Sequence, residues 1–101
     1  MEPTSLRFAR LARSLGEAAR AQGLRAPTFR SPPRLPGVSR SIVRRGPGVT
    51  VAVALRDRPW AAVVADMVEG VVATNGLAGV GADRARAALW SAASGVGEQA
   101  A

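Results

Sequence analysis

The chain contains no lysine, histidine, cysteine or tyrosine, so all fourteen of its basic residues are arginine. These absences remove the usual general bases, nucleophilic thiols, Schiff-base amines and phenolic acids of enzymes. They also remove the ordinary ligands of zinc and of iron–sulfur clusters. Asp66 and Glu69 could hold a hard cation, but two carboxylates make a poor cage, and a solvated polar face explains them better. We therefore expect no catalytic residue, no metal and no cofactor.

Long apolar runs are absent as well. The longest candidate, residues 60–77, is interrupted by Asp66 and Glu69, so it falls short of the roughly 18 apolar residues of a membrane span. The lack of cysteine excludes a disulfide scaffold and fits a reducing compartment, so we expect a cytoplasmic protein without membrane contact. No uninterrupted apolar core follows the first basic residues, which disfavours a secretory signal. Residues 5–31 also fit an organellar transit peptide, an alternative that Glu2 and Glu17 weaken.

Length and charge indicate one small domain with a polyanionic partner. A chain of 101 residues, 48% of them apolar, can bury a modest core. Residues 1–45 carry ten arginines against two acids, a net charge of +8, whereas residues 46–101 carry four arginines against five acids, a net charge of −1. This asymmetry suggests that a polyanion contacts mainly the first half. The richness in Ala, Arg, Gly, Pro and Val is also typical of a GC-rich bacterium, which accounts for part of the arginine content.

Apolar periodicity and turn residues divide the first half of the chain into three segments. Apolar residues at helical spacing predict an amphipathic helix over residues 4–23. The prolines of residues 24–38 predict an extended, polyproline-like strap that is rich in arginine. Residues 39–56 predict an antiparallel β-hairpin that turns at Gly46-Pro47-Gly48 and buries the face with Val49, Val51, Val53 and Leu55. The inward face of its first strand stays open, because arginines occur on both faces.

The second half predicts two helices. Apolar residues at helical spacing run from Trp60 to residue 74, and Asn75-Gly76 ends this helix. A last helix opens at Gly81 or Asp83, so residues 60–94 form a helix-turn-helix pair and residues 95–101 a flexible tail. The fold class is therefore α+β, a single domain over residues 1–101 with an N-terminal helix, a Pro/Arg-rich strap, an antiparallel hairpin and two C-terminal helices.

The junction between the two C-terminal helices carries a glycine pattern in residues 77–89, LAGVGADRARAAL. The order apolar-x-Gly-apolar-Gly, followed by an alanine, falls on Leu77, Gly79, Val80, Gly81 and Ala85. Residues 60–93 thereby resemble the helix-hairpin-helix motif of DNA-binding proteins that do not read sequence. The resemblance implies that the glycines let backbone N–H groups at a helix N-terminus approach a phosphate, with Arg84 and Arg86 adding contacts. A tight structural turn explains the same glycines.

The basic first half favours nucleic-acid binding. Residues 25–46 hold six arginines and four prolines and no acid, and the planar guanidinium suits phosphate. We predict a small, basic, non-enzymatic nucleic-acid-binding or nucleoid-accessory protein that contacts the phosphate backbone, of duplex DNA first, without strong sequence preference. The predicted contact residues are Arg30, Arg34, Arg40, Arg44, Arg45, Gly79, Gly81, Arg84 and Arg86.

The alternative function class is a protein–protein adaptor or a dimerisation module that uses the Val-rich helix. So small a chain leaves apolar surface that a second copy, in a homodimer or larger homo-oligomer, or another protein could cover. The residues expected at this interface are Trp60, Val64, Val68 and Trp90. Core positions explain the two tryptophans better than an interface does.

Overall fold

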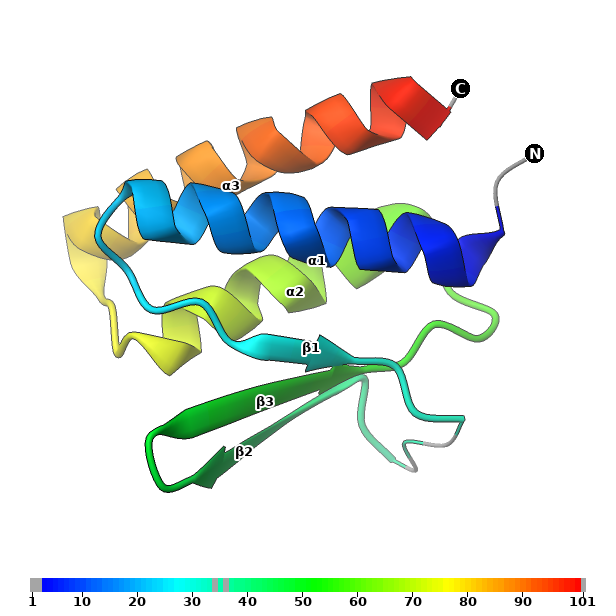
Figure 1. The fold of residues 1–101 in the computed structure, drawn as a ribbon, viewed down its shortest axis with the longest axis horizontal. Helices are drawn as coiled ribbons and strands as arrows, with labels where there is room; N and C mark the ends of the chain where they lie inside the picture. Colours follow the sequence, from blue (N-terminus) through cyan, green and yellow to red (C-terminus); the bar gives the residue numbers. More distant parts are fainter. Residues whose placement is uncertain (1–2, 34, 36, 101) are drawn as a thin grey trace.

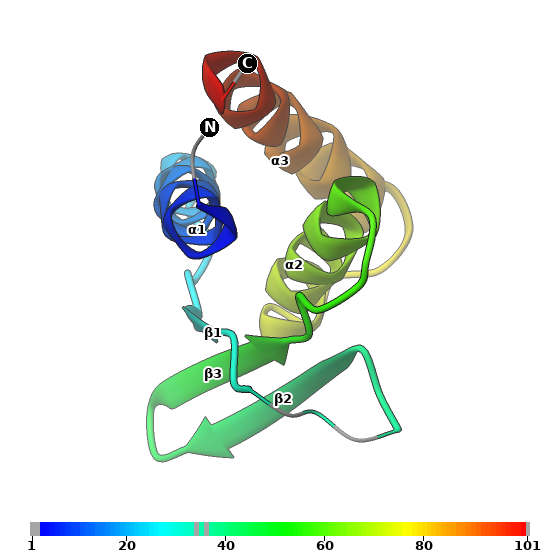
Figure 2. The same cartoon turned by 90° about the vertical axis from the view of Figure 1, so that its right-hand side faces the viewer.

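Three helices lie on one side of a small sheet in a computed structural model that describes residues 3–33, 35 and 37–100, with side chains through Val96 (Figure 1). In chain order the elements are α1 (Thr4–Ala21), β1 (Thr28–Arg30), β2 (Arg40–Arg45), β3 (Gly48–Val53), α2 (Trp60–Thr74) and α3 (Gly79–Ala100). Figure 2 shows α2 above the sheet and α3 farther out, over α1 and α2. The predicted α+β class is confirmed.

The sheet has three strands in the order β1-β3-β2. β2 and β3 pair antiparallel, which confirms the hairpin, whereas β1 pairs parallel to β3, with Phe29 opposite Val51. β1 lies inside the segment that we expected to be only a strap. The sequence did not predict β1 because three residues are too few to show an alternating pattern. The backbone angles of polyproline and of β-strands are also similar, so an extended segment can pair with a neighbouring strand.

The strand register decides which face of β2 points inward. Ile42 lies opposite Val51, and Val51 is fully buried beneath the helices. Because successive side chains alternate between the two faces of a sheet, Arg40 and Arg44 point to the helices along with Ile42. The other face, called the open face here, carries Thr28, Arg30, Ser41, Val43, Arg45, Thr50 and Ala52.

The core joins all three helices to β3, as the valine pattern predicted. Its fully buried members include Leu11, Leu15, Val51, Val53, Val63, Met67, Val68, Val71 and Leu89. α2 is helical despite its many β-branched residues, because it is apolar on most sides and lies between the sheet and the other two helices. Tertiary burial therefore outweighs the low helix propensity of valine.

α3 differs from the prediction at both ends. It begins at Gly79, so Asp83 is not an N-cap but lies in the second turn. It continues to Ala100, so residues 95–100, which we expected as a flexible tail, are helical. Val96 is only 3% exposed and belongs to the core, which supplies burial beyond Ser94 that the glycine-rich end of the sequence did not suggest.

Gly70 sets the closest approach of α2 to the sheet. A Cβ atom at this position would lie 2.7 Å from Cγ1 of Val51. We expect Gly70→Ala to lower the free energy of unfolding by about 1 to 3 kcal/mol, measured by urea denaturation, because overpacking displaces β3. Gly95→Ala is the control, because a Cβ there meets no atom within 4 Å, and it should raise stability by about 0.5 to 1 kcal/mol. In a Val51→Ala background the cost of Gly70→Ala should fall, and equal costs in both backgrounds would contradict the contact.

Candidate functional site

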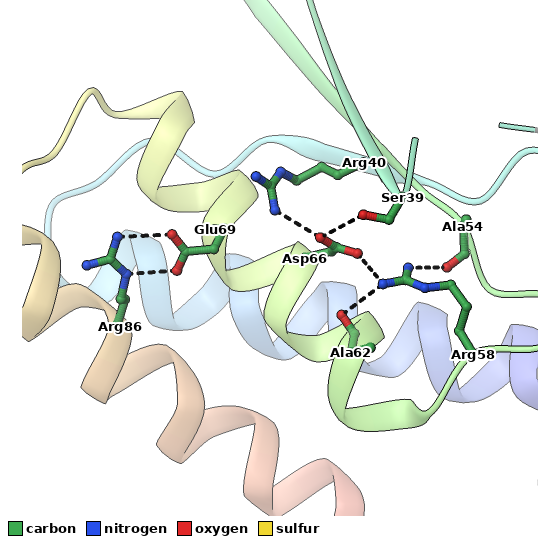
Figure 3. Close-up of polar contacts among 8 residues, drawn as sticks. All are labelled: Ser39, Arg40, Ala54, Arg58, Ala62, Asp66, Glu69 and Arg86. Carbon is green, nitrogen blue, oxygen red and sulfur yellow. Dashed lines mark hydrogen bonds and ion pairs between the residues drawn. The ribbon is translucent and has the colours of Figure 1, made fainter. Parts of the chain in front are cut away.

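A buried carboxylate joins α2 to the sheet. Asp66 is only 8% exposed, and three donors reach it from two other segments (Figure 3). Arg40 of β2 donates to its Oδ1 at 2.9 Å, and the Ser39 hydroxyl donates to the same oxygen at 3.3 Å. Arg58 of the β3–α2 connection donates to Oδ2 at 2.5 Å. These four residues are called the Asp66 clamp below.

Arg58 extends the clamp to the backbone. Its guanidinium also donates to the carbonyl oxygen of Ala54 at 2.7 Å and of Ala62 at 3.4 Å (Figure 3). It thus closes the connection between the end of β3 and the first turn of α2. We expected Asp66 on a solvated polar face, and this was wrong, because the carboxylate is enclosed by two guanidinium groups that neutralise its charge. Its role is therefore to hold α2 in place.

A second ion pair joins α2 to α3. Arg86 donates from Nε to Glu69 at 2.7 Å and from a terminal nitrogen at 3.0 Å, a two-pronged contact, and reaches Asp83 at 3.2 Å. The hydrogen bond from Arg86 is the main reason that the pKa of the Glu69 carboxyl is lowered from its ordinary value; burial acts in the opposite direction, and attraction by Arg86 and Arg40 adds to the lowering. Two carboxylates thus compensate the charge of Arg86, which leaves it poorly suited to bind a phosphate.

Three long-range hydrogen bonds bring separate segments together where α2 ends. Arg44 donates to the carbonyl oxygen of Ala73 at 3.0 Å. Its positive charge also interacts favourably with the negative end of the helix dipole there. The side chain of Asn75 accepts from the Arg25 backbone N–H at 2.8 Å and donates to the Arg25 carbonyl at 2.9 Å. The end of β2 and the segment after α1 are therefore fixed to the C-terminal end of α2. The sequence indicated Asn75 as a helix stop but gave no signal of this bridge.

Exposed arginines gather at the end of the molecule where these bonds lie. Figure 1 shows the C-terminal end of α1, the β2–β3 turn and the α2–α3 connection together at the end away from both termini. Five exposed arginines lie in these segments or within a few residues of them along the chain, and they are called the basic end: Arg20, Arg25, Arg44, Arg45 and Arg84. The molecule measures 35 × 30 × 21 Å, so this end fits within about one turn of duplex DNA, roughly 34 Å.

The acidic side chains lie elsewhere. The five described acids are Glu17, Asp57, Asp66, Glu69 and Asp83, and their ion-pair partners are Arg13, Arg56, Arg40, Arg58 and Arg86. None of these arginines belongs to the basic end. Within the described residues, no arginine of the basic end has a carboxylate partner. Among the side chains that the structure describes, no carboxylate therefore compensates the charge of these five arginines.

The predicted contact residues do not lie on one surface. Arg40 and Arg86 are bound to carboxylates of α2, and Arg44 and Arg45 point to opposite faces of the sheet although both are exposed. Arg30 shares the open face with Arg45. Gly79, Gly81 and Arg84 are exposed in the first turns of α3, and Arg34 lies outside the described residues. Sequence reasoning omitted Arg20 and Arg25, which only the tertiary fold brings to the basic end.

The four residues predicted at a protein interface lie partly in the core and partly at the surface. Val64 and Val68 are 3% and 0% exposed, so they belong to the core and not to a surface. The Val-rich helix is covered by the sheet and the other two helices, which removes it as a dimerisation surface of the folded chain. Trp60 packs partly buried against the core, with the Arg7 guanidinium 4.1 Å from its ring centre, and Trp90 is 39% exposed.

A surface groove of about 710 Å³ lies between the start of α1 and the segments after β1 and β3. Its walls are largely apolar, with Phe8, Pro32 and Leu55 among them, and its charged residues are Arg56 and Asp57. These two form an exposed ion pair with each other at 3.7 Å. The groove has the volume of a ligand site.

In the part of the chain that the structure describes, no three His, Cys, Asp or Glu side chains come close enough to hold a metal ion. None of the described helices combines the length and apolar character that crossing a membrane requires. Comparison with family models, with curated proteins and with solved structures finds no match for this chain. Function is therefore inferred from the chain's own chemistry.

Removal of the Asp66 carboxylate should destabilise the fold. In Asp66→Ala two partly buried guanidinium groups lose their counter-charge, so we expect the free energy of unfolding to fall by about 3 kcal/mol in urea denaturation. Asp83→Ala is the matched control, because this carboxylate is 76% exposed and its loss should cost less than about 1 kcal/mol. Equal effects of the two variants would show that the Asp66 clamp does not hold α2 in place.

Proposed function

We propose that the protein is a small, non-enzymatic DNA-binding protein that contacts the phosphate backbone with its basic end. The observation that supports this most is the separation of charge: the described acids pair with arginines outside the basic end, and its five arginines have no such partner among the described residues. An uncompensated arginine cluster attracts a polyanion, and each guanidinium can donate two parallel hydrogen bonds to a phosphate.

The N-terminus of α3 supports the same partner. Gly79 has a φ of 58°, a left-handed conformation that favours glycine, and both Gly79 and Gly81 are exposed. A Cβ at either position would meet no atom within 4 Å, so a phosphate could approach this backbone closely. The first N–H groups of a helix have no partner inside the helix and lie at its positive end. We therefore propose that the resemblance to the helix-hairpin-helix motif reflects phosphate binding here, next to Arg84.

The proposed binding is indifferent to base sequence. Asn and Gln side chains, which donate and accept together, read the edge of adenine. The described amide side chains are occupied within the chain: Asn75 bonds to Arg25 and Gln22 donates to the Ala18 carbonyl oxygen at 3.0 Å. Phe29 faces the core side of the sheet, so the open face has no aromatic side chain on which a base could stack. Phosphate contacts alone carry little sequence information.

The test compares two double variants with equal loss of charge. Arg45→Ala/Arg84→Ala removes two charges from the basic end, and Arg13→Ala/Arg56→Ala removes two exposed arginines elsewhere. Fluorescence anisotropy on two unrelated duplexes across a salt series should show weaker binding of the first variant to both. Its plot of log affinity against log salt should be shallower by about 1 to 2 units, at about 0.9 per phosphate contact. The second variant should keep the wild-type slope.

Three results would contradict the proposal. The first is that the wild-type protein binds neither duplex at low salt. The second is that it prefers one duplex at high salt, where phosphate contacts are screened. Equal loss in both double variants would mean that total charge governs binding rather than the basic end.

A further inference from the structure

The two edges of the sheet are protected to different degrees. β1 is three residues long, and prolines at 27, 32 and 33 flank it, which is a common way to prevent further strands from adding. β2 is six residues long, holds no proline, and pairs with β3 in an unbroken register without a bulge. β2 forms the other edge of the sheet, and Figure 2 shows it beyond β3. An edge of this length and regularity can accept another strand.

The hydrogen-bond pattern shows which backbone groups of β2 face outward. Ala54 donates to the carbonyl of Ser39 at 3.0 Å, and bonding in an antiparallel pair alternates along each strand. Ser41, Val43 and Arg45 therefore exchange bonds with β3. The N–H and C=O groups of Arg40, Ile42 and Arg44 point away from β3, toward the free edge.

The charge of β2 disfavours a second copy of the same strand. Three of its six residues are arginine and none is acidic. Antiparallel pairing of β2 with a second copy about Ile42 would set Arg40 against Arg44 of that copy, twice, because the pairing is symmetric. Like charges directly opposite each other destabilise a pair of strands. Opposite charge on the incoming strand would be favourable instead.

We propose that the free edge of β2 binds an extended, acidic segment of another protein, which adds to the sheet as a fourth strand. The side chains of such a segment alternate between the two faces. On the open face, an apolar residue would lie beside Val43, which is 44% exposed, and a carboxylate two residues along would lie beside Arg45. The backbone bonds provide affinity for any extended segment, and these two side-chain contacts select segments with an acidic and an apolar residue two positions apart. This inference does not rest on the proposed DNA binding.

The test uses a synthetic peptide of eight residues that repeats Glu-Glu-Val-Val, so that Glu and Val follow each other on each face of the strand. We expect it to bind the full chain and to slow hydrogen exchange of the Ile42 and Arg44 amides, followed by NMR. The same peptide with every backbone amide N-methylated keeps its charge but cannot donate to a strand edge, so its affinity should fall by at least about tenfold. Arg45→Glu should also weaken the parent peptide about tenfold, while Arg56→Glu, an exposed site on another surface, should not.

The proposal is overturned if the N-methylated peptide binds as tightly as the parent, if neither peptide binds, or if exchange at Ile42 and Arg44 is unchanged in the complex. If a DNA duplex binds the basic end and neither the duplex nor the peptide slows exchange of these two amides, the arginines of β2 bind nucleic acid and not a fourth strand. Because a phosphate backbone cannot extend a β-sheet, the exchange readout separates this inference from the proposed DNA binding.

Discussion

The placement of α2 depends on one buried charge. A carboxylate as enclosed as that of Asp66 is tolerated only when cations and donors compensate it, and the sheet supplies Arg40 while the connection before α2 supplies Arg58. Gly70 lies one turn further along the same face of the helix and lets its backbone approach Val51. A charge pair and a close apolar contact, four residues apart, thus hold α2 against the sheet. The inward direction of Arg40 follows from this contact.

The same constraint distinguishes two sets of arginines. Those that hold helices, Arg40, Arg58 and Arg86, are bound to carboxylates of α2. The five of the basic end have no carboxylate partner among the described residues, because the nearby acids are already occupied. Every helix lies on one side of the sheet, so no described helix covers the other face or pairs with the outer edge of β2 (Figures 1 and 2). The surfaces that we propose for DNA and for an acidic strand both follow from this arrangement.

Periodicity predicted much of the fold. Alternation over residues 49–55 indicated β3, and helical spacing from Trp60 indicated α2, because each pattern is long and set by burial. β1 is too short to alternate, and the extension of α3 depends on Val96 contacting the core. The inward face of β2 could not be predicted, since arginines flank both Ile42 and Val43 and only the partner carboxylate distinguishes them.

The candidate site was less predictable than the fold for the same reason. The sequence shows where arginines are abundant, but an arginine held by Glu69 and one that is available have the same local pattern. Arg20 and Arg25 join Arg45 only because Asn75 and the end of α2 bring these segments together. The distinction between arginines that hold the fold and arginines that bind a partner is thus a tertiary property.

That distinction can be measured directly from the side-chain Nε–H signals of arginine in ¹⁵N NMR during a titration with duplex DNA at low salt. The account predicts that the signals of Arg45 and Arg84 shift as the duplex is added, while those of Arg58 and Arg86, which are bound to carboxylates of α2, stay in place. Shifts of Arg58 and Arg86 as large as those of Arg45 and Arg84, in a complex that forms, would contradict it.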